Sequence, residues 1–176
     1  MWFVIGSRAA NQVFADFPRN IENSDWDLWT TKEEFSTWLA NKPPQLKSCY
    51  PIRPGKFHLA FTDLRKMELG LYSDTSLYAF VESNPKIWHE EKIVVPHVGN
   101  ITTLNAKCLA LLKKSHLSWN VHWEKNNNDF QWMQSQIDLN NLSSQEEVFY
   151  NKAFEKMSEI HKDKPIRQLL SHKIKI

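Results

Sequence analysis

Several common structural devices are missing from this sequence. Two cysteines are too few for a disulfide framework, so Cys49 and Cys108 are expected to be free, buried thiols. No apolar run approaches the roughly 20 residues that a membrane-spanning helix needs. The N-terminal apolar run, residues 2–5, lacks the basic lead of a signal peptide. These absences favour a cytosolic protein with no membrane partner.

Familiar nucleotide and metal motifs are missing as well. The sequence has no Gly-x-x-x-x-Gly-Lys-Ser/Thr loop and no Gly-x-Gly-x-x-Gly, which argues against a P-loop enzyme and a Rossmann dehydrogenase. A serine nucleophile elbow is also absent. His116 and His122 match no standard zinc spacing, and the two cysteines lie far apart. We therefore interpret both histidines as structural or substrate-contacting.

The remaining composition is that of a globular protein. A length of 176 residues with 41% hydrophobic content predicts one domain, or one domain with a helical appendage. Eight tryptophans and ten phenylalanines indicate a core filled by large aromatic side chains. The net charge of +2 says little, but the positive excess lies in residues 101–176. That excess fits a phosphate-bearing partner or an ordinary solvated face equally well.

The first thirty residues carry the chemistry. Residues 2–5 are of strand type, stop at Gly6-Ser7, and continue into a predicted helix over residues 8–14. After a loop, residues 25–29 read Asp-Trp-Asp-Leu-Trp, a second predicted strand. Side chains two positions apart on a strand point to the same side, so Asp25 and Asp27 are expected on one face of the sheet.

This order has a chemical meaning. Backbone N–H groups at a helix N-terminus attract an anion, Gly6 lets a phosphate approach closely, and Ser7 adds a hydroxyl. Two neighbouring carboxylates repel each other unless a cation lies between them. Mg²⁺ favours one or two carboxylates together with phosphate oxygens. The alternative is that Ser7 only caps a helix and that both Asp residues are solvated loop acids.

Gly6-Ser7, a helix, and then Asp25-x-Asp27 resembles the signature of the nucleotidyltransferase (DNA polymerase beta-like) superfamily. The 17 residues between Ser7 and Asp25 imply a longer connecting loop than is usual there. The resemblance implies an NTP such as ATP as substrate and Mg²⁺ (or Mn²⁺) as cofactor. It also implies a third carboxylate on a later strand, for which Glu68 is the best candidate, with Asp63 and Asp74 as runners-up.

The pattern around Glu68 supports that choice. Residues 66–72 alternate, with Met67 and Leu69 on one side and Glu68 and Gly70 on the other. An acid beside a glycine on one strand face suits a metal ligand with room for substrate. The alternative is an exposed strand residue.

The middle of the chain predicts alternating strands and helices. A helix opens at Thr30 or Thr31, each of which begins a Thr-x-x-Glu capping box. Strands are predicted over residues 46–52, 56–61 and 92–96, and helices over residues 77–81 and from Thr102 or Thr103 to residue 116. The last helix has a stripe that faces inward, formed by Leu104, Cys108, Leu111, Leu112 and Ser115.

A second resemblance narrows the family. Lys-Lys-Ser-His at residues 113–116, His-Trp-Glu-Lys at 122–125 and Asp129 are similar to small nucleotidyltransferase-like proteins of phages and large viruses. Lys114, Ser115 and Lys125 are our candidates for binding the triphosphate, because a triphosphate needs cations besides Mg²⁺. A basic last turn is equally normal for a helix, through its dipole. Lys125 and Asp129, four residues apart, are expected to pair.

The C-terminal part predicts a helical appendage. Ser144 to Glu147 forms a capping box, and an apolar stripe follows at helical spacing over residues 149–160. Residues 162–176 are rich in Lys and Arg. They would lie along RNA phosphates or form a docked or frayed terminus.

Together these features predict an α/β (α+β) nucleotidyltransferase fold with a mixed, mainly antiparallel sheet backed by helices. Residues 1–100 would form the catalytic core and residues 101–176 a helical part packed on it as one compact unit. The predicted activity is transfer of an NMP to an acceptor hydroxyl, on RNA and tRNA in particular, in the cytoplasm, or the host cytoplasm for a viral protein. NMP transfer to a protein or small molecule stays open, as does an inactive nucleotide-binding or protein-interaction module.

Overall fold

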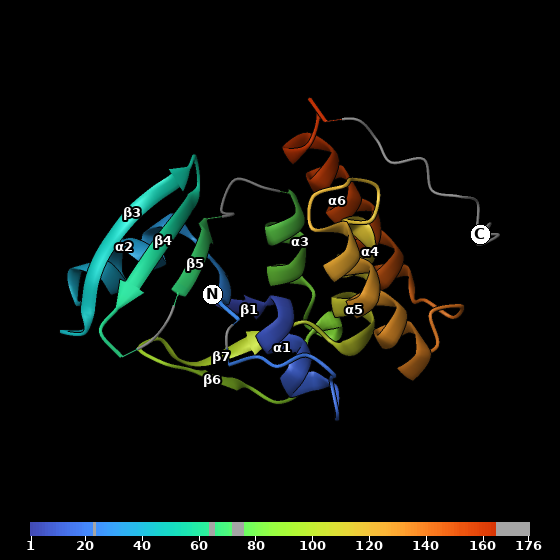
Figure 1. The fold of residues 1–176 in the computed structure, drawn as a ribbon, viewed down its shortest axis with the longest axis horizontal. Helices are drawn as coiled ribbons and strands as arrows, with labels where there is room; N and C mark the ends of the chain where they lie inside the picture. Colours follow the sequence, from blue (N-terminus) through green and yellow to red (C-terminus); the bar gives the residue numbers. More distant parts are fainter. Residues whose placement is uncertain (23, 64–65, 72–75, 165–176) are drawn as a thin grey trace.

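The computed structural model describes residues 1–22, 24–63, 66–71 and 76–164. Its centre is a seven-stranded sheet with the order β3-β4-β5-β2-β1-β7-β6 (Figure 1). The strands are β1 (Phe3–Ile5), β2 (Trp26–Thr30), β3 (Leu46–Arg53), β4 (Lys56–Phe61), β5 (Lys66–Leu71), β6 (Ile93–Val95) and β7 (Gly99–Thr103). The helices are α1 (Gly6–Val13), α2 (Lys32–Ala40), α3 (Ser76–Ser83), the 3-10 turn η1 (Pro85–Ile87), α4 (Ala106–Ser115), α5 (Trp123–Gln136) and α6 (Ser144–Ile160).

The sheet is mixed. The pairs β1–β2, β3–β4, β4–β5 and β6–β7 are antiparallel, whereas β2–β5 and β1–β7 are parallel. This confirms the predicted mixed, mainly antiparallel sheet with helices. The parallel β2–β5 pair is the important one for function, because it places the strand of Asp27 directly beside the strand of Glu68.

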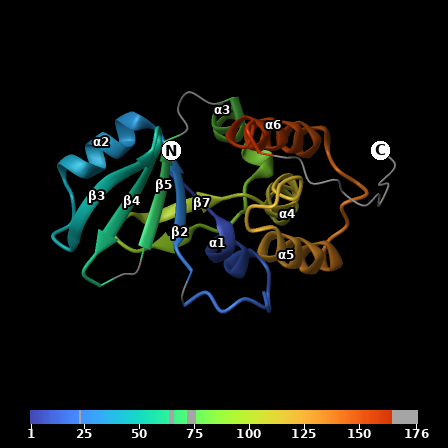
Figure 2. The ribbon, with the colours of Figure 1, turned by 45° about the horizontal axis from the view of Figure 1, so that its top comes forward.

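Helices lie against the sheet in two separate groups. Helix α2 packs on the β3–β5 end, where Phe35 meets Phe57 at 5.2 Å and Trp38 meets Phe61 at 6.4 Å between ring centroids. Helices α4, α5 and α6 gather at the opposite end of the molecule, with α3 between them and the strands (Figures 1 and 2). Among the described residues, no helix covers the face of β3, β4 and β5 that is turned away from α2 (Figure 1).

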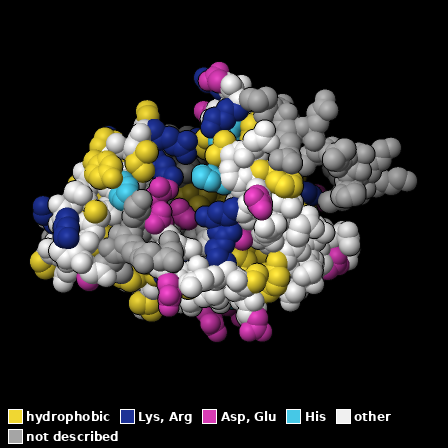
Figure 3. All heavy atoms as spheres, viewed as in Figure 1, with side chains coloured by type: hydrophobic (Ala, Val, Ile, Leu, Met, Phe, Trp, Pro, Cys, Tyr) yellow, Lys and Arg dark blue, Asp and Glu magenta, His cyan; other side chains and the backbone are white. Residues whose placement is uncertain are grey.

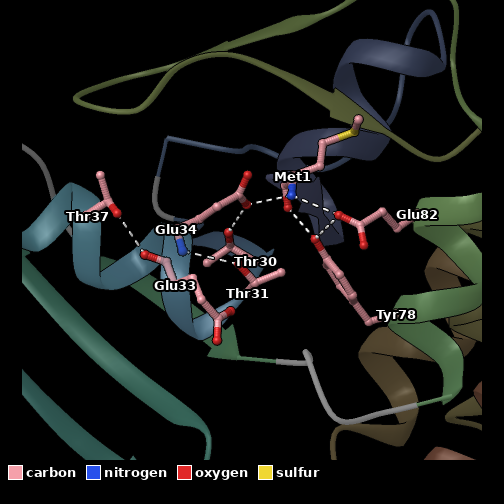
Figure 4. A network of polar contacts seen from close by, with 8 residues as sticks. All are labelled: Met1, Thr30, Thr31, Glu33, Glu34, Thr37, Tyr78 and Glu82. Atoms are coloured by element: carbon pink, nitrogen blue, oxygen red, sulfur yellow. Dashed lines mark hydrogen bonds and ion pairs between the residues drawn. The ribbon is translucent and has the colours of Figure 1, made fainter.

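A polar network ties the two groups together at the start of β1 (Figure 4). The Thr31 side chain caps α2 by accepting from the Glu34 backbone N–H at 3.1 Å. The Met1 amine lies 2.6 Å from the Glu34 carboxylate and 2.9 Å from that of Glu82 on α3. The Tyr78 hydroxyl donates to the Met1 carbonyl at 2.5 Å. Residues from α2 and α3 therefore meet on one backbone segment.

Two of the predicted helix starts are wrong. Thr102 and Thr103 lie in β7 rather than at a helix N-terminus, and Asn105 caps α4 by accepting from the Cys108 N–H at 2.8 Å. Threonine serves both as a cap and as a β-branched strand residue, so the pattern alone did not decide. The capping box of α6 uses Ser143 and Glu146, one residue earlier than predicted.

The predicted division at residue 100 falls inside β7, which pairs with β1 and β6. Asp74 and residues 165–176 of the basic tail lie outside the described residues, so their predicted roles stay predictions. None of the helices in the described part of the chain combines the length and the apolar character that a bilayer crossing requires.

Candidate functional site

The sheet register brings two acids side by side. Asp27 lies opposite Ile5 of β1 on one side and opposite Glu68 of β5 on the other. Because directly paired residues present their side chains on the same face, the two carboxylates share one surface. Asp25 immediately precedes β2. All three acids line a single cavity of about 700 Å³, together with Gly6 and Ser7.

Gly6 makes room for this pair. Its φ is +77°, and an added Cβ would lie 2.2 Å from Oδ2 of Asp27. The sequence suggested that Gly6 lets a phosphate approach the backbone. In the structure the Asp27 carboxylate itself occupies the nearest space, so only glycine fits at the start of α1. The Asp27 carboxylate therefore packs directly against the N-terminus of α1.

The electrostatics of Asp27 are unfavourable in the protein alone. Burial, followed by the negative charge of Glu68, raises the pKa of Asp27 to about 6. Glu68 is partly exposed and forms an ion pair with Lys56. Lys113, Lys56 and Lys125 act in the other direction and lower the Asp27 pKa, but less than burial raises it. The carboxylate pair therefore has excess negative charge for a ligand cation to neutralise.

Arg8 fixes the approach to β2. Its Nε donates to the Ser24 carbonyl at 2.8 Å, and its guanidinium lies 4.6 Å from the centroid of the Trp26 ring. Burial lowers the Arg8 pKa, while the charge of Asp25 raises it. The long loop predicted between the helix and the second strand is thus held where Asp25 enters the cavity.

The opposite wall of the cavity is basic. Lys113 of α4 and Lys125 of α5 line it. The predicted Lys125–Asp129 pair is replaced by other contacts, since Asp129 accepts from Arg19 at 2.5 Å and lies 2.9 Å from Lys113. Arg19 also donates to the Ser7 hydroxyl at 2.9 Å. This network, formed by Ser7, Arg19, Lys113 and Asp129, joins the Gly-Ser turn to α4 and α5.

Two predicted triphosphate residues lie elsewhere. Lys114 sits over the Tyr150 ring at 4.9 Å, toward α6, and Ser115 is fully buried with its hydroxyl donating to the Leu112 carbonyl at 2.7 Å. One step along a helix turns the side chain by about 100°. That step decides which of the two neighbouring lysines faces the cavity, and it is Lys113.

Sequence reasoning did not select three cations in or beside the cavity, namely Arg19, Lys56 and Lys113. It left His116 as a structural or substrate-contacting residue. His116 and His122 both line the cavity. Burial, then the charge of Lys113, lowers the His116 pKa to about 3, so its imidazole is neutral. His122 has a left-handed backbone with φ of 51°. The one sequence signal for Arg19 was its place in the loop that follows the Gly-Ser turn, and it contacts Ser7 and Asp129.

The donor set fits Mg²⁺ in its chemistry. Across the described residues, no group of three His, Cys, Asp or Glu side chains is already arranged around one ion position. The hard oxygen donors Asp27 and Glu68 are nevertheless adjacent in register. Mg²⁺ commonly uses one or two protein carboxylates and takes its other ligands from substrate and water, so a pair is sufficient.

Comparison with known proteins places this site in a family. The model described as "Domain of unknown function (DUF7277)" matches residues 3–91, and the chain belongs to that family. The matched region contains Gly6, Ser7 and all three acids. A search of curated proteins found no match. Among solved structures, the chain is similar to an antigenic nucleotidyltransferase-like protein from Paracoccidioides brasiliensis. The two share 12% identity with a TM-score of 0.48, over 93% of this chain and 81% of the other.

Proposed function

We propose that the protein is a metal-dependent nucleotidyltransferase that transfers an NMP from an NTP to an acceptor hydroxyl. One observation carries the proposal. Asp27 and Glu68 lie in register on adjacent parallel strands, and they share a cavity with a Gly-Ser turn at a helix N-terminus. Paired acids attract a divalent cation and the turn attracts phosphate, so the cavity favours a substrate that carries both.

The phosphates would lie between the Gly6-Ser7 turn and the basic wall. The N-terminal N–H groups of α1 and the Ser7 hydroxyl would donate to the β- and γ-phosphates. Lys113 and Lys125 line the same cavity and would balance the remaining charge. Arg19 would orient Ser7, to which it already donates. Lys114 and Ser115 have no part in this proposal, because they lie outside the cavity lining.

Asp27 and Glu68, adjacent in register, would hold the metal, and Asp25 on the same cavity would join them once the ion is bound. When bound, Mg²⁺ neutralises phosphate charge and lowers the pKa of an attacking hydroxyl. The acceptor oxygen would form a bond to the α-phosphorus, and the bond to the β-phosphate oxygen would break, releasing pyrophosphate. The hydroxyl proton would pass to a carboxylate, for which the more exposed Glu68 is suited. RNA, and tRNA in particular, is our proposed acceptor, in a cytoplasmic setting, or a host cytoplasm if the protein is viral.

One observation favours a second function. Ser7 and Glu68 already have partners within the chain, Arg19 and Lys56. A site whose groups are satisfied internally would also suit a protein that keeps the fold without turnover. Such a protein would be a nucleotide-binding or protein-interaction module.

A thermal-shift experiment separates the two functions. Each NTP is added with and without Mg²⁺ to the wild type and to Asp27→Ala, with Asp138→Ala as a carboxylate control in an exposed turn outside the cavity. Binding to the folded state alone raises stability by about 2.7 kcal/mol at a hundredfold excess over Kd. We expect a shift that needs both NTP and metal, and that only Asp27→Ala loses. Pyrophosphate release with a tRNA acceptor then tests turnover. A shift with nucleotide but no turnover favours the nucleotide-binding module. No shift with any nucleotide contradicts nucleotidyl transfer and leaves the protein-interaction module.

A further inference from the structure

A row of side chains crosses the sheet from the carboxylates to its edge. Asp27 pairs in register with Glu68, Glu68 with His58 of β4, and His58 with Tyr50 of β3. Directly paired residues share a face, so all four side chains lie on the surface that α2 leaves open. Strands are spaced by about 4.8 Å, which puts Tyr50 roughly 10 Å from Glu68. The row leads outward from the proposed reaction centre.

The outer end of this row is an exposed aromatic surface. The Tyr50 and His58 rings stack with centroids 5.0 Å apart and an interplanar angle of 24°, and Tyr50 is 48% exposed. The tryptophans that the sequence offers for stacking on bases are Trp119, Trp123 and Trp132. Trp119 is only 3% exposed and packs on Phe154 and His161, and the other two are partly buried. Tyr50 is more exposed than any of these three rings, so the candidate stacking surface lies on the sheet.

A strand irregularity adds cations to the same surface. The β3–β4 register shifts between Pro51 and Arg53, which places Arg53 opposite Lys56. Such a bulge re-aims the side chains that follow it. Both cations line the cavity, and across it Lys156 and Lys164 come from α6 and the segment after it. In Figure 3 basic side chains stand on several sides of the hollow beside the acidic group.

We propose that the acceptor is the end of a single-stranded nucleic acid lying on this open sheet face, which we call the Tyr50–His58 platform. A base stacks on the Tyr50 ring, phosphates contact Arg53 and Lys156, and the terminal hydroxyl lies beside Glu68. The alternation of an exposed ring with cations fits a chain that alternates bases with phosphates. Within the described part of the chain Arg53 has no ion-pair partner, so its charge is available. This inference rests on the proposed function, whose acceptor it specifies.

The test measures binding of a short, fluorescently labelled single-stranded RNA by anisotropy, without NTP. Tyr50→Ala should weaken binding about tenfold, within the range for one base stacked on an aromatic ring. Tyr50→Phe keeps the ring and should bind like the wild type. Both changes are at an exposed edge-strand position, so the fold is expected to persist. Circular dichroism checks this directly.

Salt dependence tests the cations. Each phosphate contact adds about 0.7 to the slope of log affinity against log salt for a single strand. Arg53→Gln should reduce the slope by that amount, whereas Lys86→Gln, an exposed cation outside the cavity lining, should leave it unchanged. If both variants lowered the slope equally, the attraction to RNA would be nonspecific, and the placement of a phosphate at Arg53 would be wrong.

Failure of this inference is distinguishable from failure of the proposed function. Asp27→Ala should keep RNA binding while losing the NTP- and metal-dependent thermal shift. A wild type that binds no RNA at low salt, or a Tyr50→Ala variant that binds as tightly as wild type, overturns the platform. In either case an intact NTP shift would leave nucleotidyl transfer standing. The acceptor would then be a protein or small molecule if the wild type binds no RNA, and an RNA held at another surface if Tyr50→Ala binds normally.

Discussion

Two aspartates near the cavity differ in whether the chain supplies cations to neutralise their charge. Asp129 on α5 is buried and has two cations of the chain against it, Arg19 and Lys113. Asp27 packs against the backbone at Gly6, and within the described part of the chain its carboxylate forms no ion pair and accepts no hydrogen bond. Its neighbour in register is another acid, Glu68. The chain neutralises one acid internally and leaves the other to be neutralised from outside.

This difference separates a structural role from a ligand-binding role. A buried acid with matched cations ties its surroundings together, and removing it leaves those cations unpaired. A partly buried acid held beside another acid, as Asp27 is, destabilises the protein until a cation arrives, and such strain is characteristic of functional sites. Replacing the two aspartates should therefore change stability in opposite directions.

The largest effect is expected at Asp129. Asp129→Ala leaves Arg19 and Lys113 unpaired in a partly buried setting and should lower the free energy of unfolding by about 4 kcal/mol. Urea unfolding measures this. The control is Glu159→Ala, which removes the more exposed pair with Lys156 and should change stability by less than about 0.5 kcal/mol. If Asp129→Ala lowers the free energy of unfolding no more than the control does, Arg19 and Lys113 are hydrated in the variant and the network does not stabilise the fold.

The opposite sign is expected at Asp27, and it depends on pH. The Asp27 pKa is raised from 3.8 to about 6 in the folded protein. Its contribution to stability is therefore fully present below about pH 4 and is lost as the pH rises through 6. The loss amounts to about 3 kcal/mol above that pH. Asp27→Asn lacks this titration, so its advantage over wild type should grow from near zero at pH 4 to that value at pH 7. Metal-free urea unfolding across this range measures the difference. If the stabilities of the wild type and Asp27→Asn changed with pH in the same way, the Asp27 charge would already be neutralised in the folded protein.

The same two aspartates show what the sequence could reveal. Gly6, Ser7 and Asp27 were found from a turn and from strand alternation, which are local patterns. Glu68 was chosen because the superfamily resemblance implies a third acid, and the structure puts all four residues on one cavity. Their roles as ligands stay predictions. The strand over residues 99–103 was missed, because its threonines also suit a helix cap.

The basic wall was predictable only in part. Lys113 was passed over for Lys114, because the rotation of a helix about its axis is set by packing and not by its own sequence. Asp129 was assigned to Lys125, four residues away, whereas its partners lie on α4 and in the loop after α1. Interactions between distant segments leave no periodic trace. The Tyr50–His58 platform depends likewise on the register of three strands.

A glycine comparison sharpens the argument about Asp27. Gly6 and Gly99 both have positive φ, +77° and +106°, so alanine is strained at either position. Only at Gly6 would the new Cβ meet another group, Asp27 Oδ2 at 2.2 Å, while at Gly99 nothing lies within 4 Å. Gly6→Ala should therefore destabilise the protein by about 2 kcal/mol more than Gly99→Ala does. In an Asp27→Ala background most of that excess should disappear, because only the Cβ of residue 27 then remains near the added Cβ, at 3.3 Å. A double-mutant cycle by urea unfolding measures this. If the excess persisted in that background, the requirement for glycine at position 6 would come from its backbone conformation and not from contact with Asp27.

The smallest expected effect is the most direct test of what neutralises Asp27. Mg²⁺ that binds only the folded protein raises the free energy of unfolding by RT ln(1 + [L]/Kd), about 1.4 kcal/mol at tenfold excess. We expect this gain in the wild type at pH 7, measured against NaCl of equal ionic strength, and none in Asp27→Asn. Asp129→Asn, which alters the acid that already has internal cations, should still respond to Mg²⁺. If Mg²⁺ stabilised Asp27→Asn and Asp129→Asn equally, the cation would bind elsewhere, and the two acids would not differ in their need for an external cation. A response lost only at Asp27 would identify it as the acid whose counterion comes from solution.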